Sequence, residues 1–137
     1  MVRVARCHCG ALSATTTGEP RKISMCHCRD CQRRTGSLFS IAAFFARDDV
    51  VTAGGNAVFE RPSASGHPVA FHFCPACGTS LWWEARRLPE LIGIAVGAFA
   101  DPDFPMPEQA VWAVDRHEWL ALPPDMPLHE RNPVRNG

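Results

Sequence analysis

The 137-residue sequence lacks features that would assign it to several common protein classes. It has no excess of charge, because its 14 basic residues equal its 14 acidic residues. Binding of nucleic-acid phosphates needs a basic surplus or a basic face, so this balance argues against nucleic acid as the main partner. No apolar run approaches the ~18 residues of a membrane span, and the first residues contain no apolar stretch of signal-peptide length. We therefore expect a globular protein of the cytoplasm that does not bind membranes.

Long segments with helical periodicity are also absent. Glycine and proline instead separate short apolar or β-branched segments, which predict strands. The expected strands cover 11–17, 21–26, 38–46, 50–53, 57–61, 69–73, 79–84, 91–99 and 109–114. The polar segment 29–36 predicts a turn or one helical turn, and Gly54-Gly55 predicts a hairpin between the two strands that flank it. The expected fold class is mainly β, with short antiparallel strands and little helix.

Cysteine, in contrast, is abundant: seven residues fall into three clusters. The clusters are Cys7-x-Cys9, Cys26-x-Cys28-x-x-Cys31 and Cys74-x-x-Cys77. An odd number of cysteines cannot all form disulfides, and a reducing cytosol disfavours structural disulfides. Thiols this close in sequence suit a shared metal ion, and zinc accepts thiolates in tetrahedral geometry. Iron–sulfur binding is a weaker hypothesis, because ferredoxin-type spacing is absent.

Seven ligands divide into four plus three. A closed structural zinc site uses four protein ligands, whereas a catalytic site keeps three and leaves one position open. Cys74-Pro-Ala-Cys77-Gly78 looks like half of a zinc ribbon, and Cys7-x-Cys9-Gly10 is the candidate for the other half. The triplet Cys26, Cys28 and Cys31 then forms a compact open site. In the alternative interpretation all seven cysteines are structural, and a nearby histidine completes the second site. The histidines in or near the clusters are His8, His27, His67 and His72.

Three sequence blocks resemble one known family. The three blocks are CHCGAL at 7–12, MCHCRDCQRRTGSLFS at 25–40 and FCPACGTSLWW at 73–83. In order and spacing they are similar to the motifs of the glutathione-dependent formaldehyde-activating enzymes, a family that includes centromere protein V. The resemblance implies a tent-like, mainly β zinc-binding fold over residues 1–122, followed by a C-terminal tail over 123–137. It implies two zinc ions per chain. Cys7, Cys9, Cys74 and Cys77 would hold the structural zinc, and Cys26, Cys28 and Cys31 the catalytic zinc.

In the name-giving members of this family, glutathione and formaldehyde combine reversibly to S-(hydroxymethyl)glutathione. The resemblance therefore predicts a carbon–sulfur lyase or synthase whose partners are a small thiol, such as glutathione, and an aldehyde. An open zinc position can bind an incoming thiol as fourth ligand and lower its pKa, which supplies the nucleophilic thiolate. The expected catalytic residues are those of the triplet: Cys26, Cys28 and Cys31.

Basic residues next to the triplet are candidates for substrate binding. Arg29, Arg33 and Arg34 could bind substrate carboxylates, because the guanidinium fork binds a carboxylate bidentately. A solvated positive turn is the alternative interpretation. His27 could relay a proton, since its pKa is near neutrality, but a residue between alternating ligands should point away from the metal.

Two other functions stay open on the sequence. One is a non-catalytic zinc module that binds a protein, which predicts two closed sites or an open site without an adjacent pocket. The other is a redox or metal sensor in which the triplet forms a disulfide on oxidation.

Overall fold

The structure is a computed structural model that describes residues 1–63 and 66–133. The described residues form ten strands, one α-helix and three short 3-10 helices, which confirms the mainly β fold with little helix. None of these helices has the length and apolar character that a membrane span requires. The chain divides into two compact units, which are described separately. Unit 1 comprises Met1–Arg21 and Ala43–Phe104, and unit 2 the segments Lys22–Ala42 and Pro105–Gly137.

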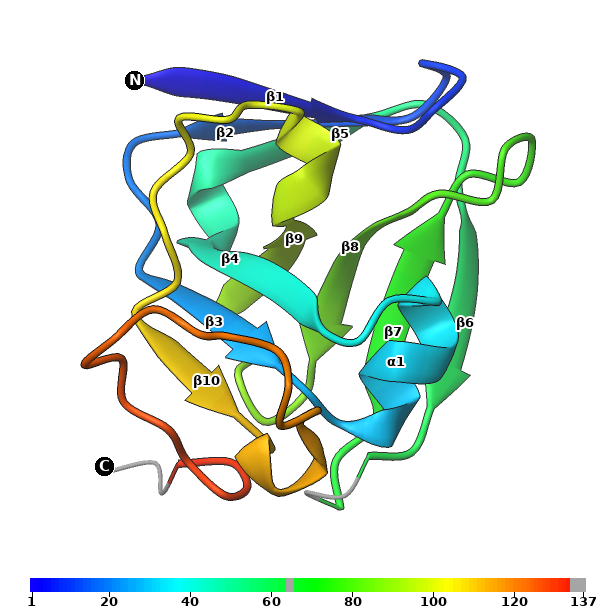
Figure 1. The fold of residues 1–137 in the computed structure, drawn as a ribbon. Coiled ribbons are helices and arrows are strands. Elements are labelled where there is room, and N and C mark those ends of the chain that lie inside the picture. The colour runs from blue at the N-terminus through cyan, green and yellow to red at the C-terminus, as the bar shows by residue number, and fades with distance from the viewer. Residues whose placement is uncertain (64–65, 134–137) are drawn as a thin grey trace. The chain divides into compact units, whose positions relative to one another are not determined.

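Unit 1 contains a three-stranded antiparallel sheet in the order β1-β2-β5 (Figure 1). Its strands are β1 (Val2–Arg6), β2 (Ser13–Thr17) and β5 (Val50–Ala53). The sequence analysis missed β1, although its valines alternate with arginines as in a half-buried strand. The loop from β1 to β2 carries the first cysteine pair, so this sheet fixes where that pair lies.

The same unit holds four further antiparallel strands, in the order β6-β7-β8-β9. They are β6 (Ala57–Arg61), β7 (Val69–Phe73), β8 (Ser80–Ala85) and β9 (Leu91–Ala95). The hairpin predicted at Gly54-Gly55 is wrong, because β5 pairs with β2 whereas β6 pairs with β7. The strand predicted over 91–99 ends early, and Val96–Phe99 form the 3-10 helix η2. Phe45, Leu81 and Ile94 are fully buried in this unit.

Strand β4 (Ser40–Ala46) belongs to unit 2 up to Ala42 and to unit 1 from Ala43. It continues directly into the 3-10 helix η1 (Arg47–Asp49). Both lie close to where the sequence predicts a buried strand followed by a turn. Six of the seven residues of β4 are apolar, and none of the seven is exposed, as a buried strand requires.

Unit 2 consists of β3 (Lys22–Cys26), α1 (Arg29–Thr35), β10 (Gln109–Val111) and the 3-10 helix η3 (Ala113–Asp115). Strand β10 runs parallel to β3, as Figure 1 shows. Its core contains buried Met25, Ala110 and Met126, with partly buried Phe39, Ile41, Leu120 and Leu122 packed against them.

Part of the predicted C-terminal tail packs in unit 2. Met126 is buried, Leu128 forms a bridge with Ala110, and the Trp112 indole N–H donates to the Asn132 side chain. Residues 134–137 of that tail lie outside the described residues.

Candidate metal centres

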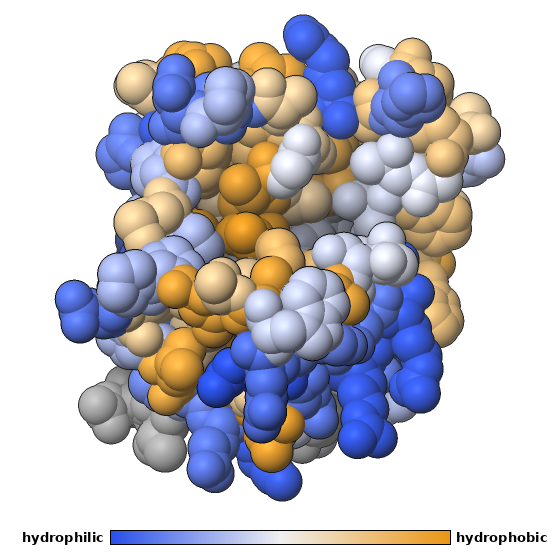
Figure 2. Space-filling view, viewed as in Figure 1, coloured by the Kyte–Doolittle hydropathy of each residue, from blue (hydrophilic) through white to orange (hydrophobic). Residues whose placement is uncertain are grey.

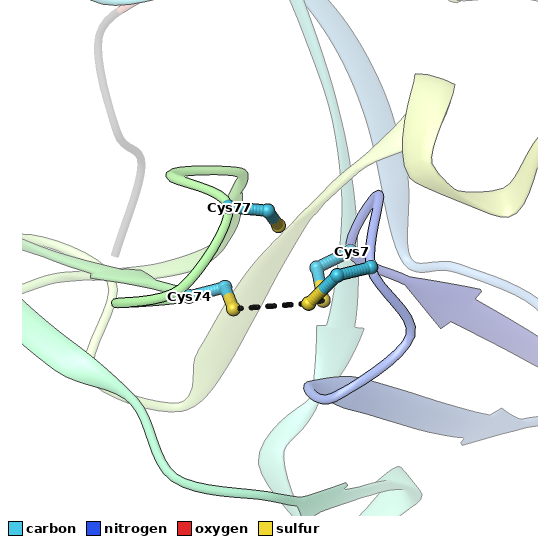
Figure 3. Close-up of side chains that lie close together, drawn as sticks. Cys7, Cys74 and Cys77 are labelled. Carbon is cyan, nitrogen blue, oxygen red and sulfur yellow. Dashed lines mark hydrogen bonds between the residues drawn. The ribbon is translucent and has the colours of Figure 1, made fainter.

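Four cysteines of unit 1 form one candidate metal centre. Cys7 and Cys9 lie in the loop after β1, and Cys74 and Cys77 lie in the turn between β7 and β8. All four sulfur atoms lie within 4.8 Å of one another. Figure 3 shows the sulfurs of Cys7, Cys74 and Cys77 pointing toward one common centre. The structure therefore brings together the two halves of the predicted closed site.

Local backbone structure explains why the two loops can present their sulfurs in this way. The residue after each pair is a glycine in the left-handed region, with φ +83° at Gly10 and +82° at Gly78. Glycine is the residue that adopts this conformation without a steric penalty. The Gly78 amide donates to the Cys74 carbonyl at 2.8 Å, and the Leu12 amide donates to the Cys7 sulfur at 3.2 Å. Each turn is thus closed by its own hydrogen bonds.

Hydrogen bonds also set the charge of this cluster. The Thr79 side chain and amide lower the pKa of Cys77 to about 5. The Ala11 amide lowers the pKa of Cys9, but hydrogen bonds to Cys7 and Cys74 outweigh it and raise that pKa to about 11. Cys77 thus favours the thiolate, whereas Cys9 favours the thiol until a cation binds. Such a donor set fits a structural zinc ion.

Thr79 is a residue of this centre that the sequence analysis missed. Its hydroxyl oxygen accepts a hydrogen bond from the His8 amide at 3.1 Å and lies 3.3 Å from the Cys77 sulfur. One side chain therefore joins the two cysteine loops. The only signal in the sequence is its position directly after Cys77-Gly78.

The three remaining cysteines form a second cluster, in unit 2. Cys26 ends β3, Cys28 is the N-cap of α1, and Cys31 lies in the first turn of that helix. Their sulfur atoms also lie within 4.8 Å of one another. The Cys28 sulfur accepts the Cys31 amide at 3.3 Å, which satisfies a free donor at the helix start. The start of α1 thus places Cys28 beside Cys31, and the end of β3 supplies Cys26.

Within the described residues, this second group contains three thiols and no histidine, aspartate or glutamate. The interpretation in which a histidine completes the site therefore finds no support in unit 2. The ring of His27 is fully buried, and neither ring nitrogen has a hydrogen-bond partner among the residues that the structure describes. Burial lowers the pKa of His27, and the charges of Arg116 and His117 lower it further. A buried neutral ring is a poor proton relay.

The electrostatics of the triplet fit a bound cation. Hydrogen bonds to Cys28 and Cys31, together with burial, raise the pKa of Cys26 far above its ordinary value. A hydrogen bond to Cys26 lowers the pKa of Cys31, but the bond to Cys28 and burial raise it to about 11. Three crowded thiols resist ionisation because the negative charges of the thiolates that would form repel one another. A metal ion removes that repulsion, so the donor set suits zinc.

The three candidate arginines have different surroundings. Arg34 donates to the Ser40 hydroxyl at 2.8 Å, and its positive charge lowers the pKa of Cys31. Arg29 pairs with Asp115 at 3.6 Å. Arg29 and Arg33, but not Arg34, line a cavity of about 470 Å³ beside α1. The arginines therefore separate into one that supports the triplet and two that face a pocket.

Comparisons with known proteins identify the family of this chain. The family model of the glutathione-dependent formaldehyde-activating enzyme matches residues 2–115. The chain belongs to this family. It is 26% identical over 129 residues to a Halomonas elongata protein named "Putative glutathione-dependent formaldehyde-activating enzyme", covering 89% of this chain and 82% of that one. The crystal structure of a Rhodobacter sphaeroides protein shares its fold, with a TM-score of 0.57 and 22% identity over 74% of this chain and 90% of that one.

The matched span of the formaldehyde-activating family includes all seven cysteines and ends at Asp115. It therefore contains both cysteine clusters, α1 and η3. Two pocket residues, Arg116 and His117, lie just beyond it. The sequence analysis missed both, because they follow the triplet by more than 80 positions and carry no motif.

Proposed function

We propose that this protein is a zinc-dependent carbon–sulfur lyase or synthase of the S-(hydroxymethyl)glutathione synthase type. One observation carries the proposal: this member of the formaldehyde-activating family has one cluster of three thiols and a second cluster of four thiols. A four-thiol set saturates tetrahedral zinc, whereas a three-thiol set leaves one position for a substrate. The proposed complement is two zinc ions per chain, and the proposed location is the reducing cytoplasm.

The reaction joins the sulfur of glutathione to the carbon of formaldehyde. The carbon–sulfur bond forms as the carbonyl π bond breaks, and the thiol proton ends on the oxygen, which becomes the hydroxyl group of the product. The reverse reaction returns that proton to sulfur. Zinc held by Cys26, Cys28 and Cys31 would supply an open position that lowers the pKa of the incoming thiol.

The residues of unit 2 prepare this site in two ways. The cap formed by Cys28 fixes the start of α1, and so fixes Cys31 relative to Cys28. Arg34 places a positive charge near Cys31 and is itself held by Ser40. Both features favour the thiolate form that a metal site requires.

Exchange spectroscopy by NMR tests the proposal. Glutathione and formaldehyde are mixed at equilibrium, and the exchange rate between free glutathione and its adduct is measured with and without zinc-loaded protein. We expect the wild-type protein to accelerate exchange and Cys28→Ser to abolish the acceleration. Cys9→Ser, the same atomic change in the other cluster, is the matched control and should keep acceleration as long as circular dichroism shows a folded protein.

Unchanged exchange with a wild-type protein that carries two zinc ions would refute this proposed function. Acceleration that survives in Cys28→Ser would place the chemistry outside the triplet. Zinc release and disulfide formation within the triplet on mild oxidation would instead favour the sensor function.

A further inference from the structure

A cavity of about 470 Å³ lies between α1 and the segment that contains η3, wholly within unit 2. Its volume falls in the range of small-molecule sites. Arg29, Gln32 and Arg33 line it from the helix, and Asp115, Arg116 and His117 line it from the η3 segment. Figure 2 shows hydrophilic side chains gathered over this part of the surface. The cavity is therefore suited to a polar ligand.

The charges in this cavity do not balance. Three arginines face a single carboxylate, that of Asp115, and Arg29 pairs with it at 3.6 Å. Arg33 and Arg116 form neither a side-chain hydrogen bond nor an ion pair with any residue in 1–63 or 66–133. Two guanidinium groups that face one cavity without an anion make a site for a negatively charged ligand.

Direct contacts link the cavity to the cysteine triplet. The Gln32 amide nitrogen donates to the His27 carbonyl at 2.9 Å and to the Asp115 carbonyl at 3.3 Å. Gln32 therefore bridges the backbone between Cys26 and Cys28 to the opposite wall of the cavity. The helix that carries Arg33 is capped by Cys28 itself. The cavity wall and the triplet thus share α1 and the hydrogen bonds of Gln32.

The geometry points to Arg33 and Arg116 as the specificity-determining anion subsite for the thiol substrate. They bind a carboxylate of the substrate and so select carboxylate-bearing thiols over neutral or cationic ones. Arg34 has no part in this subsite, because it is held by Ser40 away from the cavity lining. This assignment rests on the proposed function in one respect: the sulfur of the substrate thiol is taken to bind at the cysteine triplet.

Binding of S-methylglutathione, measured by isothermal titration calorimetry, tests the subsite without any chemistry at sulfur. This thioether keeps both carboxylates of glutathione but has no thiol to ionise. We expect wild-type binding to weaken as salt rises, because charge pairing is screened. Arg33→Gln and Arg116→Gln should each weaken binding by about tenfold, the scale of a lost charge-assisted hydrogen bond. The diethyl ester of S-methylglutathione should bind weakly to all variants.

Two controls separate loss of the subsite from loss of folding. Arg86→Gln removes an exposed arginine of unit 1, outside the cavity, and should bind like the wild type. Arg116→Lys keeps the charge but loses the fork, so its affinity should lie between those of the wild type and Arg116→Gln. Equal binding by wild type, Arg33→Gln and Arg116→Gln would overturn the subsite, as would no binding of S-methylglutathione by the wild type.

Failure of the subsite and failure of the proposed function give different results. If S-methylglutathione binds with the expected arginine dependence but exchange is not accelerated, the subsite stands and the proposed reaction fails. If exchange is accelerated but Arg33→Gln and Arg116→Gln keep the wild-type KM for glutathione, the reaction stands and the subsite fails.

Discussion

Replacement of Gly54 by alanine should destabilise unit 1 at the four-cysteine centre. Gly54 follows β5 with φ at +100°, in the region that residues with a Cβ atom avoid. A Cβ atom at this position would lie 2.0 Å from the Ala11 carbonyl oxygen and 3.1 Å from the Leu12 Cα atom. These are backbone atoms of the loop in which the Leu12 amide donates to the Cys7 sulfur. The substitution therefore forces apart β5 and the loop that holds the cysteines.

The magnitude follows from two contributions. A non-glycine residue in an avoided backbone region costs roughly 1–3 kcal/mol, and overpacking against atoms that cannot rotate away costs about 1–3 kcal/mol. We expect Gly54→Ala to lower the free energy of unfolding by about 2–6 kcal/mol, a large share of the ~5–15 kcal/mol of a typical domain. Gly55 is the matched control. No atom of residues 1–63 or 66–133 lies within 4 Å of a Cβ added there, so Gly55→Ala should change stability by no more than about 0.5 kcal/mol.

Urea unfolding of both variants with zinc present measures this difference. Competition with a chromogenic chelator then reports how firmly the four-cysteine centre holds its metal. We expect Gly54→Ala to release one zinc ion more readily than Gly55→Ala. Equal unfolding midpoints for the two variants would refute the close approach between Gly54 and the Ala11–Leu12 backbone.

Three further predictions concern unit 2. Met126→Ala should lower the free energy of unfolding by about 2–5 kcal/mol in urea titration, because Met126 is buried. Met106 is exposed, so Met106→Ala should change that free energy by less than about 0.5 kcal/mol. Equal effects of the two substitutions would contradict the packing of the C-terminal segment. Arg34→Gln should weaken zinc binding by the triplet about tenfold in chelator competition, and unaltered affinity would show that its charge does not act on Cys31. The zinc affinity of the triplet should fall as pH falls. Cys26 and Cys31 have raised pKa values, so they are protonated at neutral pH and must release protons to bind metal. Calorimetry in buffers of different ionisation enthalpy counts the released protons, and a count of zero would contradict the prediction.

The division of the cysteines into four and three could be predicted from the sequence because ligand spacing is local. Cys7-x-Cys9 and Cys74-x-x-Cys77 are both short turns followed by glycine, and two such turns can share one metal ion. The same reasoning left the role of the histidines open. Only the structure shows that the three-thiol group lacks a histidine within the described residues and that His27 is buried.

Errors arose where a local signal competes with distant pairing. Gly54-Gly55 between two β-branched segments is a good hairpin signal, yet β5 pairs with β2 and β6 with β7. The reason is the contact of Gly54 with Ala11, which lies more than 40 positions away. The strand predicted over 91–99 stops at Ala95. The prediction is too long because the apolar character of the segment continues into the short helix η2.

The cavity beside α1 illustrates a further limit of the sequence. Arg29, Arg33 and Arg34 are all candidates from the sequence because they flank the cysteines of the triplet, but Arg34 donates to Ser40 instead of lining the cavity. Arg116 reaches the same cavity from a segment that no motif marks. Proximity in sequence indicates the right segment, and only the structure shows which of its arginines line the cavity.

Zinc K-edge X-ray absorption combined with metal counting tests the central claim most directly. The account predicts two zinc ions per chain that share seven protein sulfur ligands, at the usual zinc–sulfur distance of about 2.3 Å. Addition of glutathione should add one further sulfur ligand to the zinc ions. A single zinc ion per chain, or a sulfur count that glutathione leaves unchanged, would contradict an open three-cysteine site that binds the substrate thiol.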